Sequence, residues 1–398
     1  MEKYIRLEYF FILMVLIWDP VQRFILKVDG AGYSITLLTI VVLLFLIKKK
    51  YFYKIAFKKP LMIYCFWLLY TYINSIIIGQ GHDIPFLSFI TQITVPFVLM
   101  TVISLEYVHN KKRLLNVLIF GMYLGVILVL IFVSKTDQGR IGGEMNSNTI
   151  GIMATILTLL LYLKYYYRGF SIYFFSILVA VPVVAIIMTG SRTAFGGLTL
   201  LIILHFFIYR SSSFWLSTIK IVLGFIFFMF PMKYILENTA LGERILNTSN
   251  QSDGMEFQTG NPVLDAFGDR GFFYYQGWEV LKEKPITGIG LGNFKNYNSL
   301  ELAQHSEYMI QLTELGAIGF LLFAYFYFFI LKNLNEIRLF IRNKREAELY
   351  IGYILIVLAM ITATRMYRVW FMFLILGLVI GFIVRTKQIN YSKKLRLK

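Results

Sequence analysis

Apolar runs long enough to cross a bilayer recur along the chain, and they constrain its fold more than any other feature. Within one of them, the stretch from Ile177 to Thr189 is almost wholly apolar. Only Gly190, Ser191 and Arg192 separate it from the next run. A water-soluble domain with 58% hydrophobic and 15% charged residues would expose a mostly apolar surface. A spanning helix needs roughly 20 mostly apolar residues, so a bilayer is the solvent that fits this chain.

The pattern predicts an all-α polytopic membrane protein with about 12 transmembrane helices. Their expected centres are near residues 15, 41, 69, 95, 124, 157, 179, 201, 224, 322, 355 and 376. The first run is the weakest because Asp19 and Pro20 interrupt it, and we expect it to be retained since no A-x-A-like cleavage site follows it. Short connections at 80–84 and 189–192 predict antiparallel neighbours. Polar residues and glycines concentrate in residues 237–305, which we expect to form one large extracytoplasmic loop between helices 9 and 10.

The predicted organisation is therefore transmembrane helices 1–9 in residues 1–236, the large loop in 237–305, and helices 10–12 with a basic cytoplasmic tail in 306–398. If the N-terminus is cytoplasmic, most lysines and arginines fall on the cytoplasmic side, as the positive-inside rule requires. The short outer loops then hold only Arg23, Lys27, Lys135, Arg140, Arg192, Arg365 and Arg368. The net charge of +17 is thus a topology signal spread over inner loops, and it does not indicate nucleic-acid binding.

Arginines on the predicted outer face are candidates for function because they oppose the charge bias that sets topology. A single arginine near the end of an apolar helix is more typical of an interfacial anchor. Here five map to the same face: Arg140, Arg192, Arg270, Arg365 and Arg368. The planar fork of a guanidinium suits phosphate or diphosphate best, so the group predicts a site for a membrane-bound anion. The single cysteine, Cys65, lies in an apolar run and indicates neither an intrachain disulfide nor a metal-thiolate site.

The segment 285–294, PITGIGLGNF, has glycines at alternate positions after a proline. This composition excludes a regular helix interior and predicts a loop whose backbone comes close to something. No strand precedes it and no helix starts on its last glycine, so it is not a dinucleotide-binding fingerprint.

His305 stands immediately before a predicted helix, with Ser306 or His305 itself near the cap and Glu307 in the first turn. Taken alone, a histidine at a helix start is more often a structural hydrogen-bonding group than a base. Glu307 and Glu314 are likewise more typical of helix-start and interfacial residues than of catalytic carboxylates.

Four segments together resemble the O-antigen ligase/polymerase superfamily of integral membrane glycosyltransferases. They are NSNTIGIMATI (146–156), TGSRTAFGG (189–197), the glycine-rich loop at 285–294, and HSEYMIQLTELGAIGF (305–320). The order of these segments, the twelve helices and the large loop between the ninth and tenth also fit that family. Ser306 departs from the pattern, since many relatives have asparagine after the histidine, so an amide contact is not expected there.

The resemblance implies an enzyme that uses polyprenyl-diphosphate-linked glycans at the outer face of the cytoplasmic membrane. It implies that Arg192 and Arg270 stabilise the developing charge on the diphosphate without a metal or other cofactor. His305 would orient or deprotonate the attacking sugar hydroxyl. Further candidates for binding the diphosphate are Arg140, Arg365 and Arg368, and candidates for binding substrate are Asn148, Gly290 and Glu307.

The expected activity is that of a polysaccharide polymerase, which moves a glycan from undecaprenyl diphosphate onto another lipid-linked repeat unit, alone or with a chain-length regulator. A ligase, which moves the glycan to a lipid A core or another acceptor, uses the same donor chemistry and stays open. A transporter of polyprenyl lipids is a third hypothesis. Such proteins usually show related halves and charged or broken helices near the midplane, whereas the unusual residues here gather at the outer surface.

Overall fold

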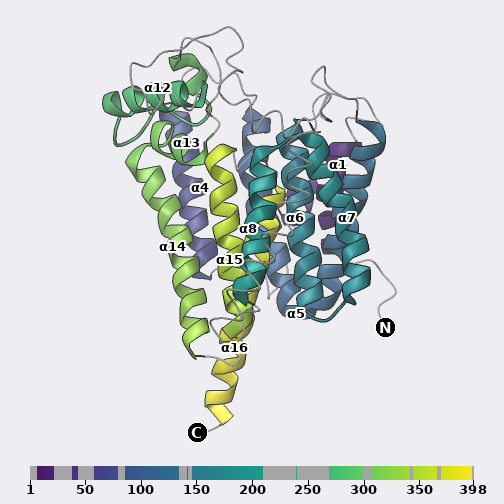
Figure 1. The fold of residues 1–398 in the computed structure, drawn as a ribbon. Coiled ribbons are helices and arrows are strands. Elements are labelled where there is room, and N and C mark those ends of the chain that lie inside the picture. Colours follow the sequence, from purple (N-terminus) through teal and green to yellow (C-terminus); the bar gives the residue numbers. More distant parts are fainter. Residues whose placement is uncertain are drawn as a thin grey trace.

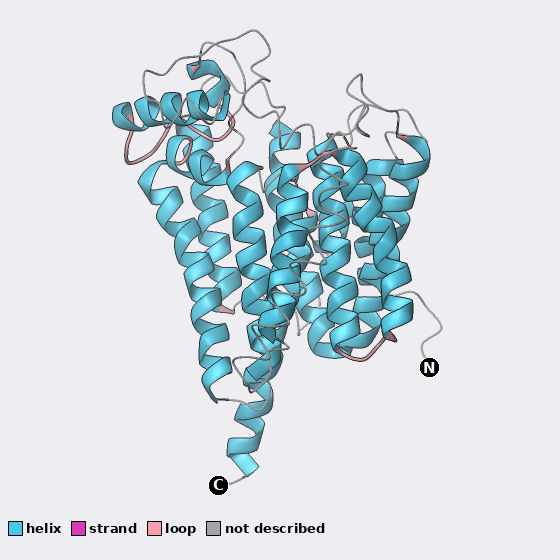
Figure 2. Cartoon of the chain, viewed as in Figure 1, coloured by secondary structure: helices cyan, strands magenta, loops and turns pink. Residues whose placement is uncertain are grey.

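The structure, a computed structural model, describes residues 7–21, 38–43, 58–78, 86–133, 141, 146–208, 239, 269–298, 304, 306–340, 344–364 and 369–396. Across these residues every regular element is a helix (Figure 2). The predicted all-helical class is therefore confirmed for this part of the chain.

Figure 1 shows how the helices are arranged. They are α1 (Leu7–Pro20), α4 (Lys59–Ile78), α5 (Phe86–Phe132), α6 (Ser147–Tyr166), α7 (Ile172–Thr189), α8 (Arg192–Ile208), α12 (Asp269–Glu283), α13 (Glu307–Thr313), α14 (Gly316–Phe340), α15 (Lys344–Met360) and α16 (Phe371–Arg396), with short 3-10 turns η2 (Phe294–Tyr297) and η3 (Ile361–Ala363). Seven helices in the described part are long and apolar enough to cross a membrane. Eleven of the twelve predicted centres fall on described helical residues, and the centre near 224 lies outside the described residues.

Two predicted spans, centred near 95 and 124, fall in α5, which consists of two helices joined at a break. The backbone breaks at Asn110, whose φ of −149° and ψ of 78° are not helical. The Asn110 side-chain oxygen accepts a hydrogen bond from the backbone N–H of Arg113 at 3.1 Å, which caps the second half of the helix. The two halves are therefore separate spans, connected at Asn110 without a longer loop.

Helix α6 lies between α7 and α8 and packs against both (Figure 1). A left-handed residue, Gly190 with φ of 59°, ends α7, and α8 begins two residues later. The short connection at 189–192 does reverse the chain as predicted. The expectation that α7 and α8 are packed neighbours is only partly right, because they contact each other far less than either contacts α6.

A layer at one end of the bundle covers α4 and α14 and consists of α12, η2, α13 and the glycine-rich loop at 285–292 (Figure 1). It has a small apolar core of its own: Phe272, Phe273, Val280, Ile289 and Phe294. The sequence predicted only a loop here. The structure places α12 inside it. The helix predicted to follow His305 is divided into the short α13 and α14, which begins at Gly316.

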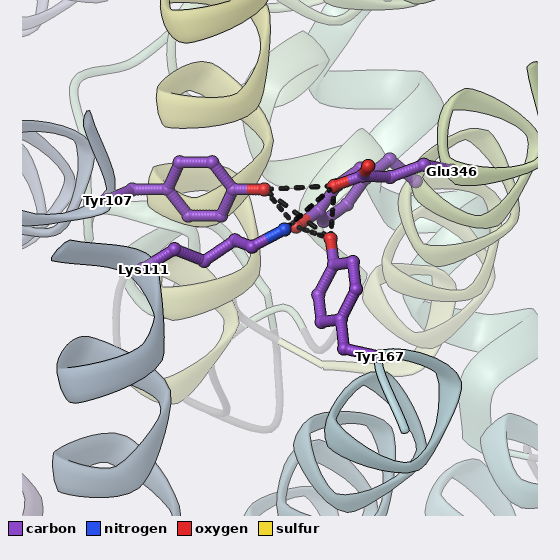
Figure 3. Close-up of polar contacts among 5 residues, drawn as sticks. Tyr107, Lys111, Tyr167 and Glu346 are labelled. Atoms are coloured by element: carbon purple, nitrogen blue, oxygen red, sulfur yellow. Dashed lines mark hydrogen bonds and ion pairs between the residues drawn. The ribbon is translucent and has the colours of Figure 1, made fainter. Parts of the chain in front are cut away.

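A buried polar cluster lies at the opposite end of the bundle and joins α5, α6 and α15 (Figure 3). A carboxylate oxygen of Glu346 accepts hydrogen bonds from the Tyr107 hydroxyl at 3.1 Å, from Lys111 Nζ at 3.4 Å, and from the Tyr167 hydroxyl. Lys111 Nζ also lies 3.5 Å from the centroid of the Tyr167 ring. Burial raises the pKa of Tyr167 well above its ordinary value. Lys111, which the sequence assigned to topology alone, therefore also packs three helices together.

Candidate functional site

Nine residues were predicted for the site, and the structure describes them unevenly. Asn148, Arg192, Gly290 and Glu307 are fully described, and Arg270 is placed by its backbone as the second residue of α12. The remaining four, Arg140, His305, Arg365 and Arg368, lie outside the described residues. For these four residues, only the positions of their neighbours in the sequence are described.

The neighbours of three predicted site residues contact one another in the layer at the end of the bundle. Gln304 Nε2, next to position 305, donates to the carbonyl oxygen of Phe273 at 3.1 Å, one turn beyond position 270. The Tyr274 hydroxyl donates to the carbonyl oxygen of Thr362 at 3.4 Å, three residues before position 365. The structure thus brings the chain segments that carry Arg270, His305 and Arg365 to one place.

Arg192 begins α8 at the same end of the bundle and is half-buried. The turn before it is fixed by buried hydroxyl groups: Thr189 Oγ1 accepts from the backbone N–H of Ser191, and Ser191 Oγ accepts from the backbone N–H of Ala194, both at 3.3 Å. These side chains satisfy N–H groups that the first turn of a helix leaves without partners. The arginine between two apolar runs is therefore held at a rigid, capped helix start.

Asn148 lies in the first turn of α6, beside the start of α8. A Cβ added to Gly151 would lie 2.8 Å from the Ala194 Cβ and 2.9 Å from the Ser191 Cβ, so the two helix starts are in close contact. Further along, Gly197 of α8 packs against Met360 at the end of α15. Asn148 and Arg192 therefore share the end of the bundle that also carries α12 and α13.

The glycine-rich loop packs its backbone on the turn between α13 and α14. Ile289 N–H donates to the carbonyl of Thr313 at 3.1 Å and Gly290 N–H to the carbonyl of Glu314 at 2.8 Å. In return, Ala317 N–H donates to the carbonyl of Pro285 at 2.9 Å. The close approach predicted for this loop is to the chain itself. A substrate contact by Gly290 stays a prediction, and its amide is already engaged.

Glu307 and Glu314 are buried, at 1% and 2% exposure. Glu307 starts α13, as the sequence predicted, and Glu314 ends it. A Glu314 oxygen accepts from the backbone N–H of Gly292 at 2.7 Å, which ties the loop to the helix end. Both carboxyl groups are therefore covered by other parts of the protein.

The sequence missed the polar contacts that α4 makes with this layer. Trp67 Nε1 donates to Gln311 Oε1 at 2.9 Å, the Tyr70 hydroxyl to the carbonyl of Leu315 at 2.8 Å, and Asn74 Nδ2 to the carbonyl of Thr287 at 2.6 Å. The three donors are spaced by three and four residues, so they lie on one face of α4. That spacing was visible in the sequence, but nothing there indicated which segment it faces.

The predicted chemistry uses no metal. Among the residues that the structure describes, no three His, Cys, Asp or Glu side chains are grouped so that they could hold a metal ion. The expectation of metal-free chemistry also depends on residues outside that part, and it stays a prediction.

Comparison with known families gives one match. Residues 177–324 match a family model described as O-antigen ligase. The match begins in α7 and ends in α14, so it includes Arg192, Arg270 and His305 and leaves out α4, α15 and α16. No curated protein matches the chain. Enzymes of the matched family transfer lipid-linked glycans. The chain is thus a multi-pass membrane protein whose residues 177–324 are similar to the O-antigen ligase family.

Proposed function

We propose that the protein is a polysaccharide polymerase that transfers a glycan from undecaprenyl diphosphate onto another lipid-linked repeat unit. The observation that carries the proposal is the convergence of the family's segments. The contacts of Gln304 and Tyr274 draw the segments carrying Arg270, His305 and Arg365 together, at the end of the bundle where Arg192 starts α8. Two or three guanidinium groups there provide a site for the diphosphate of the donor.

The distribution of charge supports an outer location for this site. Most described lysines and arginines lie at the end of the bundle away from α12 and α13: Lys111, Lys112, Arg113, Lys164, Arg168, Arg338, Lys344, Arg345, Arg385 and Lys387. Under the positive-inside rule that end faces the cytoplasm. We therefore place the site at the outer face of the cytoplasmic membrane, with twelve spans and residues 237–305 outside.

The proposed chemistry is a displacement at the anomeric carbon of the donor. The acceptor hydroxyl oxygen forms the new glycosidic bond while the carbon–oxygen bond to the diphosphate breaks, and the polyprenyl diphosphate leaves with the electron pair. His305 takes the proton of the hydroxyl. Arg192 and Arg270 hold the diphosphate and stabilise its growing charge, which guanidinium groups do better in a partly buried site than in water.

Transfer to a different acceptor is the second candidate. The description of the matched family, O-antigen ligase, favours it. Polymerase and ligase share the donor and the leaving group, so the same arginines serve both. The same family match makes a transporter of polyprenyl lipids the weakest of the three candidates.

The purified protein, incubated with lipid-linked repeat units, tests the proposal. A ladder of longer lipid-linked glycans supports the polymerase. One transfer onto added lipid A core, with no ladder, supports the ligase. Unaltered lipid, with and without a chain-length regulator, contradicts both. The Arg345→Ala variant is the matched control, because this exposed arginine lies at the opposite end of the bundle.

A further inference from the structure

Three buried side chains, Trp67, Gln311 and Glu307, are linked by hydrogen bonds from α4 to the start of α13, and we call them the relay. Trp67 Nε1 donates to Gln311 Oε1 at 2.9 Å, and Gln311 Nε2 donates to Glu307 Oε1 at 2.8 Å. The three residues are 5%, 0% and 1% exposed. Water therefore does not compete with these bonds, and each partner determines what the next one offers.

The indole of Trp67 determines which group donates and which accepts in each hydrogen bond of the relay. An indole N–H can only donate, so the Gln311 oxygen must face Trp67 and its NH₂ group must face Glu307. A carboxylate that accepts a hydrogen bond is stabilised in its ionised form. The pairing of Trp67 with Gln311 thus favours Glu307 as an anion, although burial alone would favour the neutral acid.

The groups around Glu307 come from three helices. Three tyrosines lie close enough for its charge to act on their hydroxyls: Tyr64 of α4, Tyr308 of α13 and Tyr327 of α14. Burial, and then the Glu307 charge, raise the pKa of Tyr308, whose hydroxyl donates to the carbonyl of Leu358 at 2.9 Å. This tyrosine therefore stays protonated, and Glu307 is the group whose charge the relay controls.

We infer that Trp67 and Gln311 are positioning residues for glycan transfer, which hold Glu307 as a carboxylate beside the acceptor end of the site. The inference rests on the proposed function and extends it to α4, outside the matched residues 177–324. Glu307 is two residues after His305, so their Cα atoms are at most about 7 Å apart. A negative charge near the imidazole stabilises the imidazolium that forms when His305 takes the acceptor proton.

The Trp67→Phe variant tests the relay because it keeps the ring and removes the N–H group. Without that donor, the Gln311 amide can turn its oxygen toward Glu307, which favours the protonated acid. The neutral acid stabilises the imidazolium of His305 less, so we expect the acidic limb of the pH profile of kcat/KM, which His305 sets, to move to lower pH by about one unit. The Gln311→Met variant, which cannot donate to Glu307, should move it in the same direction.

Tyr70→Phe is the matched control. It removes a hydrogen bond of similar length from the same face of α4, to the carbonyl of Leu315, and leaves the relay intact. Its thermal stability is expected to fall about as far as that of Trp67→Phe, while its pH profile coincides with that of the wild type. A purely structural role for Trp67 predicts the same profile for both variants, and that result overturns the inference.

The Glu307→Gln background separates the relay from other causes of a shift. It has no carboxylate to protonate, so adding Trp67→Phe should move the acidic limb no further. An equal shift in both backgrounds contradicts the inference. The protonation of Glu307 is also read without an activity assay, from the carboxylate infrared band that Glu307→Gln removes. An inactive wild type defeats the proposed function, whereas an infrared titration unmoved by Trp67→Phe defeats the relay alone.

Discussion

Gly288 packs directly on Gly316: a Cβ on Gly288 would lie 2.6 Å from the Gly316 nitrogen, and a Cβ on Gly316 would lie 2.6 Å from the Gly288 nitrogen. Both have positive φ, at 69° and 66°. Backbone thus meets backbone where the glycine-rich loop reaches the turn between α13 and α14. This contact explains why the loop at 285–292 and the start of α14 both carry glycine. It also sets the position of α13, and hence of the site residues next to it.

Alanine at either glycine is expected to destabilise the layer by at least about 2 kcal/mol, because the Cβ meets backbone atoms and the left-handed conformation itself costs about 1–2 kcal/mol. Thermal unfolding in detergent measures the effect. Gly196→Ala in α8 is the control, since a Cβ there has nothing within 4 Å. It should be neutral or slightly stabilising. Equal stability of all three variants contradicts the packing argument.

Arg192 and Arg270 are expected to be essential for transfer. Replacing either by alanine should abolish product while the protein stays folded in the membrane. Lysine should restore activity only in part, since a point charge does not reproduce the two parallel hydrogen bonds that a guanidinium gives to phosphate. Product formation from a lipid-linked donor is the measurement. Full activity of Arg192→Lys would show that paired phosphate contacts are not what this residue supplies. For Arg140, Arg365 and Arg368 we expect at least one to be an ordinary interfacial anchor.

Much of the fold was predictable, for a simple physical reason. An apolar run of spanning length has one stable conformation in a bilayer, so eleven of the twelve predicted centres fall on described helical residues. The loop at 285–292 was also predictable, because proline and glycine restrict the local backbone whatever surrounds them. The start of α13 at Glu307 followed from the same kind of local signal.

Features that depend on distant partners were not predictable. Helix α12 mixes aromatic and charged residues without an apolar period, so its sequence gives no helical signal of its own. Trp67 and Gln311 are 244 residues apart, and nothing in the apolar run around Trp67 indicates an acceptor for its N–H group. The burial of Glu314 depends in the same way on a loop 22 residues earlier.

The topology is expected to place residues 237–305 outside the cell. Single cysteines at Gln258 and Asn343, introduced separately into a Cys65→Ser background, should react differently with a membrane-impermeant maleimide on intact cells. The first should be labelled and the second only after the cells are opened. Both positions lie outside the described residues, so the experiment does not disturb any contact described above. The reverse labelling pattern would remove the proposed site from the outer face.

The cluster around Glu346 is expected to stabilise the end of the bundle opposite α12 and α13. Glu346→Gln leaves the Lys111 ammonium without its ion-pair partner. The two side chains are 12% and 25% exposed, so partial solvation limits the loss to about 1–3 kcal/mol. The double variant Glu346→Gln/Lys111→Met should recover much of it, because no unpaired charge remains. Thermal unfolding of the wild type, Glu346→Gln, Lys111→Met and the double variant gives the coupling energy between the two side chains. Strictly additive effects would contradict the pairing.

His305 is expected to act on the acceptor hydroxyl. His305→Ala should lose activity and keep its affinity for the lipid-linked donor, because Arg192 and Arg270 bind the diphosphate independently. In the wild type the neutral imidazole is the working form, so activity should fall as pH drops through about 6.5, where imidazole ordinarily gains a proton. His305→Gln separates two roles, since an amide can hydrogen-bond a hydroxyl and cannot take its proton. Substantial polymerisation by the glutamine variant would reduce His305 to a positioning group. Near-wild-type activity of the alanine variant would remove it from the site.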